Sequence, residues 1–427
     1  MPKKYLKYEA TYRFLIIVSV LFLSTSLQCK GYSVLSHEAL IDVTWDKTIQ
    51  PLLLKKYPGS TDSQLKEAHA YAYGGAVVPD MGYYPFGSKL FTNLVHYVRS
   101  GDFVNAALDE ARDINEYAFA LGILCHYNAD KYGHPMATNH CVPLVYTKDK
   151  EKFGTVVTYE QDPVAHIRME FGFDIVQTAR GNYASEKYHD FIGFKVSRPL
   201  LERAFLKTYG LDINNIFNDL PLAISSFRWI IKNLFPTITR AAWSAKKKDI
   251  TKSNPGITKR KFQYKMRKAN YYHEYGKKHQ KPGFFPGVLA AVVKILPKVG
   301  PLKDLKIKIP GPDAEKLFIQ SFDTVQARYT AILLTLPRKN PCFTNIDFDT
   351  GNNTTPGEYG LADRTYINLI LELSDDKFKR VDVDLQQNIL KFYGQCNEKL
   401  AATEGIDNYN KITQALDSLK IIHPLLD

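Results

Sequence analysis

The sequence predicts an all-α protein, a bundle of many helices with additional C-terminal helices. Apolar residues recur at intervals of three and four positions through most of the long segments, which is the spacing of one helix face. Runs that alternate apolar and polar residues, as a half-buried strand would, are scarce. With 427 residues, 45% hydrophobic and 23% charged, the chain can bury one large core or two ordinary ones, and this composition argues against disorder.

The main helical domain is expected to span residues 32–245. Ser36, Asp62 and Ser88 each precede an apolar, helix-forming run, so we expect them to cap three of its helices. A C-terminal helical region, residues 311–427, is expected to pack on this domain. The predicted helices, in order, cover residues 36–53, 61–77, 88–101, 103–130, 163–179, 313–336, 361–374 and 383–402.

Residues 1–31 are typical of a cleaved signal peptide. Four basic residues precede a short apolar run at positions 14–23, and small and polar residues follow it. The run is about half as long as the roughly 20 residues of a membrane-spanning helix, so a permanent anchor is the weaker interpretation. We therefore expect an exported protein, periplasmic or secreted.

The cysteines do not form a zinc-thiolate motif, because no two of them stand two to four residues apart. In an oxidising compartment, Cys125 with Cys141, or Cys342 with Cys396, could form disulfides, and the sequence leaves the pairing open.

A basic insertion, residues 246–310, separates the two helical regions. Between positions 246 and 308, eighteen Lys or Arg stand against three acidic residues, a balance of 18 − 3 = +15, whereas the whole chain carries +12. An apolar, aromatic-tipped stretch follows the basic one, a combination that suits an anionic membrane surface and makes peripheral membrane contact possible. Nucleic-acid phosphates would attract the same charges, and a solvated insertion between helices is the plainer interpretation.

Imidazole and carboxylate groups recur at helical spacing in the main domain. His126, Asp130 and His134 stand four residues apart, and so do His166 and Glu170. Residues four apart share one face of a helix, so each set converges, with His134 just past a helix end at Gly133 and Pro135. Such groups suit zinc, although a buried His beside an Asp is often only structural. Further residues of the same types are His37, Asp80 and His96.

This ordered set resembles the bacterial zinc-dependent phospholipase C family, whose helical fold binds three zinc ions. The local forms HYNAD, GHP and HIRME carry the resemblance, which covers roughly residues 31–245. Fungal-type single-strand nucleases share the fold plan and the order of ligands. The resemblance therefore implies a phospholipase C-like bundle but leaves the choice between lipid and nucleic acid open.

The resemblance implies two to three Zn²⁺ ions and a ligand set for each. The expected ligands are Asp80, His96, His126 and Asp130 for the first zinc; His134, His166 and Glu170 for the second; and His37, bridging Asp130 and the main chain of Tyr32 for the third. His140 is the substitute if His134 points away.

The resemblance also implies a phosphodiesterase that hydrolyses phospholipids with a water activated by zinc, and the signal-peptide pattern makes it an exported one. Asp80, at the edge of the expected cluster, is the residue that we expect to accept the proton of that water. The alternatives are a single-strand nuclease-like enzyme and an inactive helical binding protein stabilised by metal. The expected partner is a phospholipid or another phosphodiester substrate, with no obligate protein partner.

Overall fold

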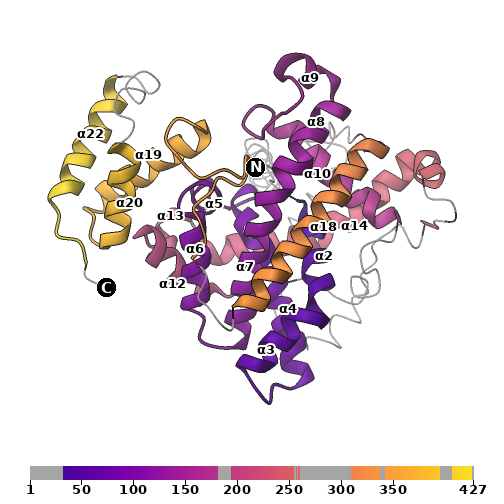
Figure 1. Cartoon of the computed structure of the whole chain (residues 1–427), viewed down its shortest axis with the longest axis horizontal. Helices are drawn as coiled ribbons and strands as arrows, with labels where there is room; N and C mark the ends of the chain where they lie inside the picture. Colours follow the sequence, from indigo (N-terminus) through magenta and orange to yellow (C-terminus); the bar gives the residue numbers. More distant parts are fainter. Residues whose placement is uncertain are drawn as a thin grey trace, which may run out of the picture.

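The computed structural model is all-α in the part of the chain that it describes, which confirms the predicted fold class (Figure 1). Helices and loops account for these residues, and two isolated β-bridges are the sole extended pairings among them. The described residues are 32–180, 194–253, 256, 258–259, 308, 310–336, 342–394 and 406–425.

The first helices follow one another with short connections and contribute the core of the molecule. In Figure 1 they surround the long helix α7, which runs through the middle of the view. Their bounds are α2 (Val34–Thr44), η1 (Trp45–Ile49), α3 (Gln50–Lys56), α4 (Asp62–Val77), η2 (Val78–Tyr83), α5 (Lys89–Tyr97), α6 (Ser100–Asp109), α7 (Ile114–Gly133), η3 (His134–Thr138), α8 (Asn139–Val145), α9 (Thr147–Phe153), α10 (Pro163–Arg180), α12 (Arg198–Tyr209), α13 (Ile213–Ile216) and α14 (Leu220–Ser253).

One of the three predicted helix caps is confirmed, and two are wrong. Ser88 caps α5, because its hydroxyl accepts a backbone N–H of the first turn. The cap of α2 is Ser33, and Ser36 lies inside the helix, where its hydroxyl donates to a carboxylate of α10. Thr61 caps α4 in place of Asp62, since it forms a reciprocal capping box with the third residue of the helix.

Helices α4 and α7 cross at very short range, and glycine makes this crossing possible. A Cβ atom on Gly75 would lie 1.9 Å from the carbonyl oxygen of Phe119, and one on Gly122 would lie 2.1 Å from that of Ala72. Any side chain at either position would force the helices apart. The crossing matters for the site because the polar end of α7 begins one turn after Gly122.

The predicted helix end at Gly133 is correct for α7, but the chain does not leave the helical path there. It continues through one π-helical turn, η3, into α8. Pro135 is the second residue of η3, so the helical path continues through a proline at the π turn. The wider turn places His134 on the inner side of the bundle, where it is 1% exposed.

The C-terminal helices lie against the core. The long helix α18 runs beside α7 (Figure 1), and the Tyr329 hydroxyl donates to the carbonyl oxygen of Leu121 at 2.8 Å. Helix α19 packs on α5 and on α22. The bounds are α18 (Pro312–Thr335), α19 (Gly360–Asp375), α20 (Val383–Gly394) and α22 (Ile406–Ile421).

A disulfide between Cys125 and Cys141 is not formed, since both are free and buried. Each thiol is packed in the core, and burial raises the pKa of Cys141 to about 12, which disfavours its thiolate. Cys342 is also free, whereas its suggested partner Cys396 lies outside the described residues.

The expected signal peptide and residues 260–307 of the basic insertion also lie outside the described residues. The boundary expected at residue 245 falls within α14. Among the helices that the structure describes, none combines the length and the apolar composition that a membrane crossing requires.

Candidate metal centre

The eight side chains singled out in the sequence meet in the interior of the main domain. All are at most 1% exposed, and they form three groups whose nitrogen and oxygen atoms lie within 4.8 Å of one another in each group. Five helical elements and the π turn η3 bring them together. The groups are His37, His126 and Asp130; Asp80, His96 and His126; and His134, His166 and Glu170.

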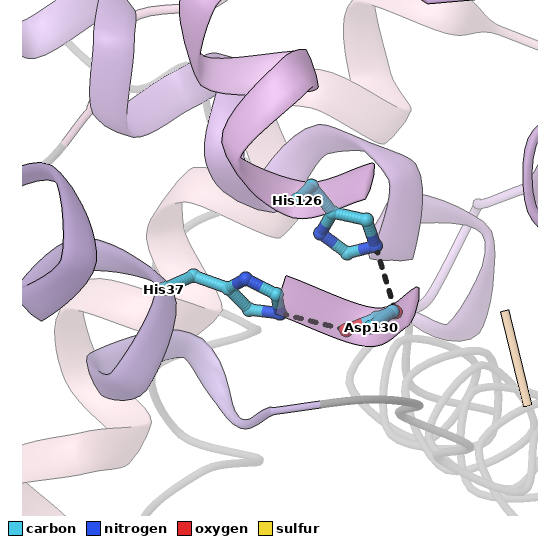
Figure 2. A group of neighbouring side chains, drawn as sticks. All are labelled: His37, His126 and Asp130. Atoms are coloured by element: carbon cyan, nitrogen blue, oxygen red, sulfur yellow. Dashed lines mark ion pairs between the residues drawn. The ribbon is translucent and has the colours of Figure 1, made fainter. Parts of the chain in front are cut away.

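In the first group, Asp130 lies beside two stacked imidazoles and faces a ring nitrogen of each (Figure 2). Its Oδ1 is 3.6 Å from Nε2 of His37, and its Oδ2 is 3.1 Å from Nε2 of His126. The two rings stack with their centroids 4.4 Å apart. The spacing of His126 and Asp130 on α7 gives this geometry directly, whereas His37 arrives from α2.

The second group shares His126 and adds His96 from α5 and Asp80 from η2. The two Nε2 atoms of the histidines are 3.3 Å apart, and Oδ1 of Asp80 is 3.4 Å from Nε2 of His96. Nδ1 of His96 faces the backbone carbonyl of Thr92 at 2.8 Å, and Nδ1 of His126 faces that of Ala76 at 2.9 Å. Since a carbonyl can only accept, Nδ1 carries a proton in both rings, and Nε2 is the atom that each ring turns into the group.

The third group is built from η3 and α10. Nδ1 of His166 is 3.2 Å from Oε1 of Glu170, and Nε2 of His166 is 2.7 Å from Oδ1 of Asn139. The amide nitrogen of Asn139 donates to a backbone carbonyl, so its Oδ1 is the atom that faces the ring. Nε2 of His166 therefore carries the proton, and the lone pair on its Nδ1 faces the carboxylate of Glu170. A cation between these two groups would stabilise the pair.

Asp130 is a buried, ionised carboxylate inside the centre. Burial alone would raise the pKa of this carboxyl, but the neighbouring His126 and His134 outweigh burial and hold the pKa well below its usual range. Burial lowers the pKa of His126, yet Asp130 outweighs it and raises the value to about 9. For His37, burial and the adjacent His126 lower the pKa to about 3. A neutral imidazole is the form that binds a metal.

The residues present fit zinc. Nε2 of His37 and Nε2 of His134 have no hydrogen-bond partner among the described residues, and both atoms are buried. A buried polar atom without a partner costs free energy unless an ion satisfies it. Imidazole nitrogens and carboxylate oxygens without thiolates form the ligand set of many catalytic zinc sites.

Tyr32 lies beside the first group and is 1% exposed. Its ring centroid is 6.2 Å from that of His37, and its hydroxyl hydrogen-bonds Ser321 on α18. The ring rests on Gly133, where a Cβ atom would come within 2.8 Å of it. The beginning of the described chain is thus held between α7 and α18, next to the side chains of the centre.

Sequence reasoning missed two residues of the centre, Asp349 and Asn139. Oδ1 of Asp349 is 3.1 Å from Nδ1 of His134, and burial, which would raise the pKa of this carboxyl, is outweighed by His134 and His166, which hold the pKa well below its usual range. The sequence carried a weak signal, since Asp347 and Asp349 alternate with apolar residues in a turn-rich loop. His140, the suggested substitute for His134, is exposed and plays no part in the groups.

An all-α core that encloses three clusters of imidazole and carboxylate groups is suited to holding metal ions. Residues 36–218 match the model of a family described as zinc dependent phospholipase C. This match covers all eight side chains and supports the zinc-dependent phospholipase C family for the helical core, which implies a hydrolase of phosphodiester bonds. No curated protein and no solved structure matches the chain.

Proposed function

We propose that this protein is an exported, zinc-dependent phosphodiesterase that hydrolyses phospholipids to diacylglycerol and a phosphorylated head group. The observation that carries the proposal is the convergence of eight buried imidazole and carboxylate side chains within the part of the chain that matches the family. A structural zinc site needs four ligands, so a cluster of this size favours catalysis over a purely stabilising role.

In this proposal the three groups hold two to three zinc ions. Asp80, His96, His126 and Asp130 would hold one ion, and His37 with Asp130 would hold a second. The main-chain amine and carbonyl of Tyr32 complete that second set after processing of the precursor. The remaining ion belongs to the third group, which His134, His166 and Glu170 form. The burial of all these side chains excludes competing water from their ligand atoms.

When bound, zinc ions would lower the pKa of a bound water and neutralise phosphate oxygens of the substrate. The chain's own contribution is to place a base and to hold the ligands rigidly. Asp80 lies in the short helix η2, with Oδ1 at 3.4 Å from Nε2 of His96, and we assign it the role of accepting the proton of the attacking water. The fixed Nδ1 protons of His96 and His126 keep both rings in one orientation throughout.

Export and membrane contact complete the proposal. The basic and apolar composition of residues 1–31 supports export, and that of residues 246–308 supports docking on an anionic membrane. If the insertion docks the enzyme, deleting residues 246–308 should weaken binding to vesicles that contain anionic lipid. Unchanged vesicle binding by the deletion variant would remove this role.

The activity is tested with purified protein, phosphatidylcholine vesicles and single-stranded DNA offered in parallel. We expect two to three zinc ions per chain, release of phosphocholine, and loss of turnover with chelator that zinc restores. Asp80→Asn should lower kcat by about 10²- to 10⁴-fold, the usual contribution of a general base.

Three results would contradict the proposal. DNA cleavage at the higher kcat/KM would favour a nuclease, and zinc without turnover on any phosphodiester would favour a binding protein. A protein that holds no zinc would remove the metal centre itself.

A further inference from the structure

A loop from the C-terminal region, residues 342–359, reaches back to the metal centre; we call it the Asp349 loop. The N–H of Phe348 donates to the carbonyl oxygen of His96 at 3.1 Å, and the Phe348 ring centroid is 5.1 Å from that of His96. Gly351 has a φ of +74°, and a Cβ atom there would lie 2.6 Å from the carbonyl oxygen of Lys131. The loop therefore lies directly on α5 and α7.

The loop buries one carboxylate against the third group of the centre. Asp349 is 1% exposed, and its Oδ1 is 3.1 Å from Nδ1 of His134. Its Oδ2 accepts the N–H of Tyr159 at 2.8 Å and the hydroxyl of Tyr359 at 2.6 Å. Because two donors hold Oδ2, the side chain has one orientation available, with Oδ1 turned to His134.

The same loop reaches a second histidine through Asn139. The amide nitrogen of Asn139 donates to the backbone oxygen of Asp349 at 2.8 Å, which turns its Oδ1 toward Nε2 of His166 at 2.7 Å. Asp349 thus fixes two rings. Its carboxylate holds His134, and its backbone oxygen holds His166 through the amide of Asn139.

These contacts follow the pattern by which proteins hold metal-binding histidines. A ligating imidazole almost always donates its second ring N–H to a carboxylate, a backbone carbonyl or water, which sets its tautomer. For His96 and His126 the acceptors are carbonyl oxygens of α5 and α4. For His134 the acceptor is Asp349, so its Nε2, the buried atom without a hydrogen-bond partner, presents a lone pair toward the centre.

We infer that Asp349 is a positioning residue of the zinc site formed by His134, His166 and Glu170, so that this site is completed by a part of the chain outside residues 36–218. The inference rests on the proposed function. Asp349 acts through His134, whose proton it holds on Nδ1, and the Asp349 loop fixes His166 through Asn139. Replacing the carboxylate should therefore loosen one zinc ion and leave the ions at Asp130 in place.

The test compares Asp349→Asn with Asp347→Asn, the same change in the same loop. An amide at position 349 has a single oxygen acceptor. Its NH₂ group must therefore face either the Nδ1–H of His134 or the N–H of Tyr159 and the hydroxyl of Tyr359, all of which are donors. Zinc affinity at one site should fall about 10- to 100-fold, the usual effect of losing such a partner. Asp347 holds Thr350, and its carboxylate has no hydrogen bond or ion pair with a histidine among the described residues, so its variant should keep wild-type zinc affinity.

Two readouts other than activity decide the test. Zinc per chain is measured by elemental analysis after dialysis against graded chelator, and Co²⁺-substituted protein gives an absorption spectrum that reports ligand geometry. Asp349→Asn should lose one zinc and alter the cobalt spectrum, and Asp349→Glu should restore part of both. A purely structural role would change the melting temperature without this selective loss.

Equal zinc affinity and an unchanged cobalt spectrum in Asp349→Asn would overturn the inference while the wild-type protein still binds zinc. If Asp349→Asn does not fold, Tyr359→Phe decides, because it removes one donor to Oδ2 and keeps the ring. We expect a several-fold loss of affinity at one site, and an unchanged affinity would overturn the inference. A wild-type protein without zinc would instead contradict the proposed function.

Discussion

The two ends of the metal centre are held in place by different means. His96 is oriented by a backbone carbonyl of its own helix α5 and His126 by one of the neighbouring helix α4, so both acceptors lie in the first part of the chain. His134 and His166 are oriented by side chains, and both supports lead to Asp349, which lies far away in sequence. The ligand motif alone therefore does not define a complete centre, because its second end depends on residues that the motif does not contain.

The largest effect is expected from Asp130→Asn, because Asp130 faces His37 at 3.6 Å and His126 at 3.1 Å. Removing one partner of a buried charge pair costs about 3–5 kcal/mol. The zinc-free variant should lose about that much free energy of unfolding in urea, and the loaded variant should lose the zinc ions near Asp130.

The same variant sharpens the comparison between the two ends. If they are independent, Asp130→Asn should retain one zinc at the site of His134, His166 and Glu170, as elemental analysis would show. Loss of all zinc would mean that the two ends bind metal as one unit.

An intermediate effect is expected from Gly122→Ala, which changes the crossing of α4 and α7, the helix that carries His126. The new Cβ atom would lie 2.1 Å from the carbonyl oxygen of Ala72, so α4 and α7 must separate. Overpacking of this kind costs about 1–3 kcal/mol or more, measured as a lower free energy of unfolding.

Gly394→Ala is the matched control, since a Cβ atom there meets nothing within 4 Å. Its stability should change by less than about 0.5 kcal/mol. Equal stability of the two variants would show that the crossing of α4 and α7 is not as tight as described.

The smallest effect is expected from Asp174→Asn, because Asp174 holds the beginning of α2 next to His37. The carboxylate accepts the N–H groups of Leu35 and Ser36, at 3.0 and 3.1 Å, and the Ser36 hydroxyl at 2.7 Å. An amide cannot accept all three, so the free energy of unfolding should fall by about 1–2 kcal/mol. Zinc beside His37 should also bind more weakly, whereas an unchanged zinc affinity would show that α2 is fixed by packing alone.

The sequence contained the parts of the centre that follow from helical spacing. His126 and Asp130 on one face of α7, and His166 and Glu170 on one face of α10, required only a period of 3.6 residues. The convergence of His37, Asp80 and His96 with them rested on the resemblance, because no local rule brings α2, η2 and α5 together.

The remainder depends on tertiary contacts that no local pattern encodes. Asp349 lies in an irregular loop, where periodicity gives no direction to a side chain, and its partner His134 is more than two hundred positions earlier. The cap at Ser33 was missed because the carboxylate that draws Ser36 into the helix comes from α10. The π turn at His134 likewise depends on its neighbours, since Gly133 and Pro135 suggest a break when considered alone.

The reach of the Asp349 loop has a consequence for biosynthesis. Domains fold as the chain emerges, with N-terminal segments first. The eight candidate ligand positions are all synthesised well before residue 349, so a nascent chain can gather its histidines while the anchor of His134 is still untranslated. A lipid-degrading activity that needs this anchor would be switched on only near the end of translation, which limits the time during which an unfinished chain can damage the membrane of the cell that makes it.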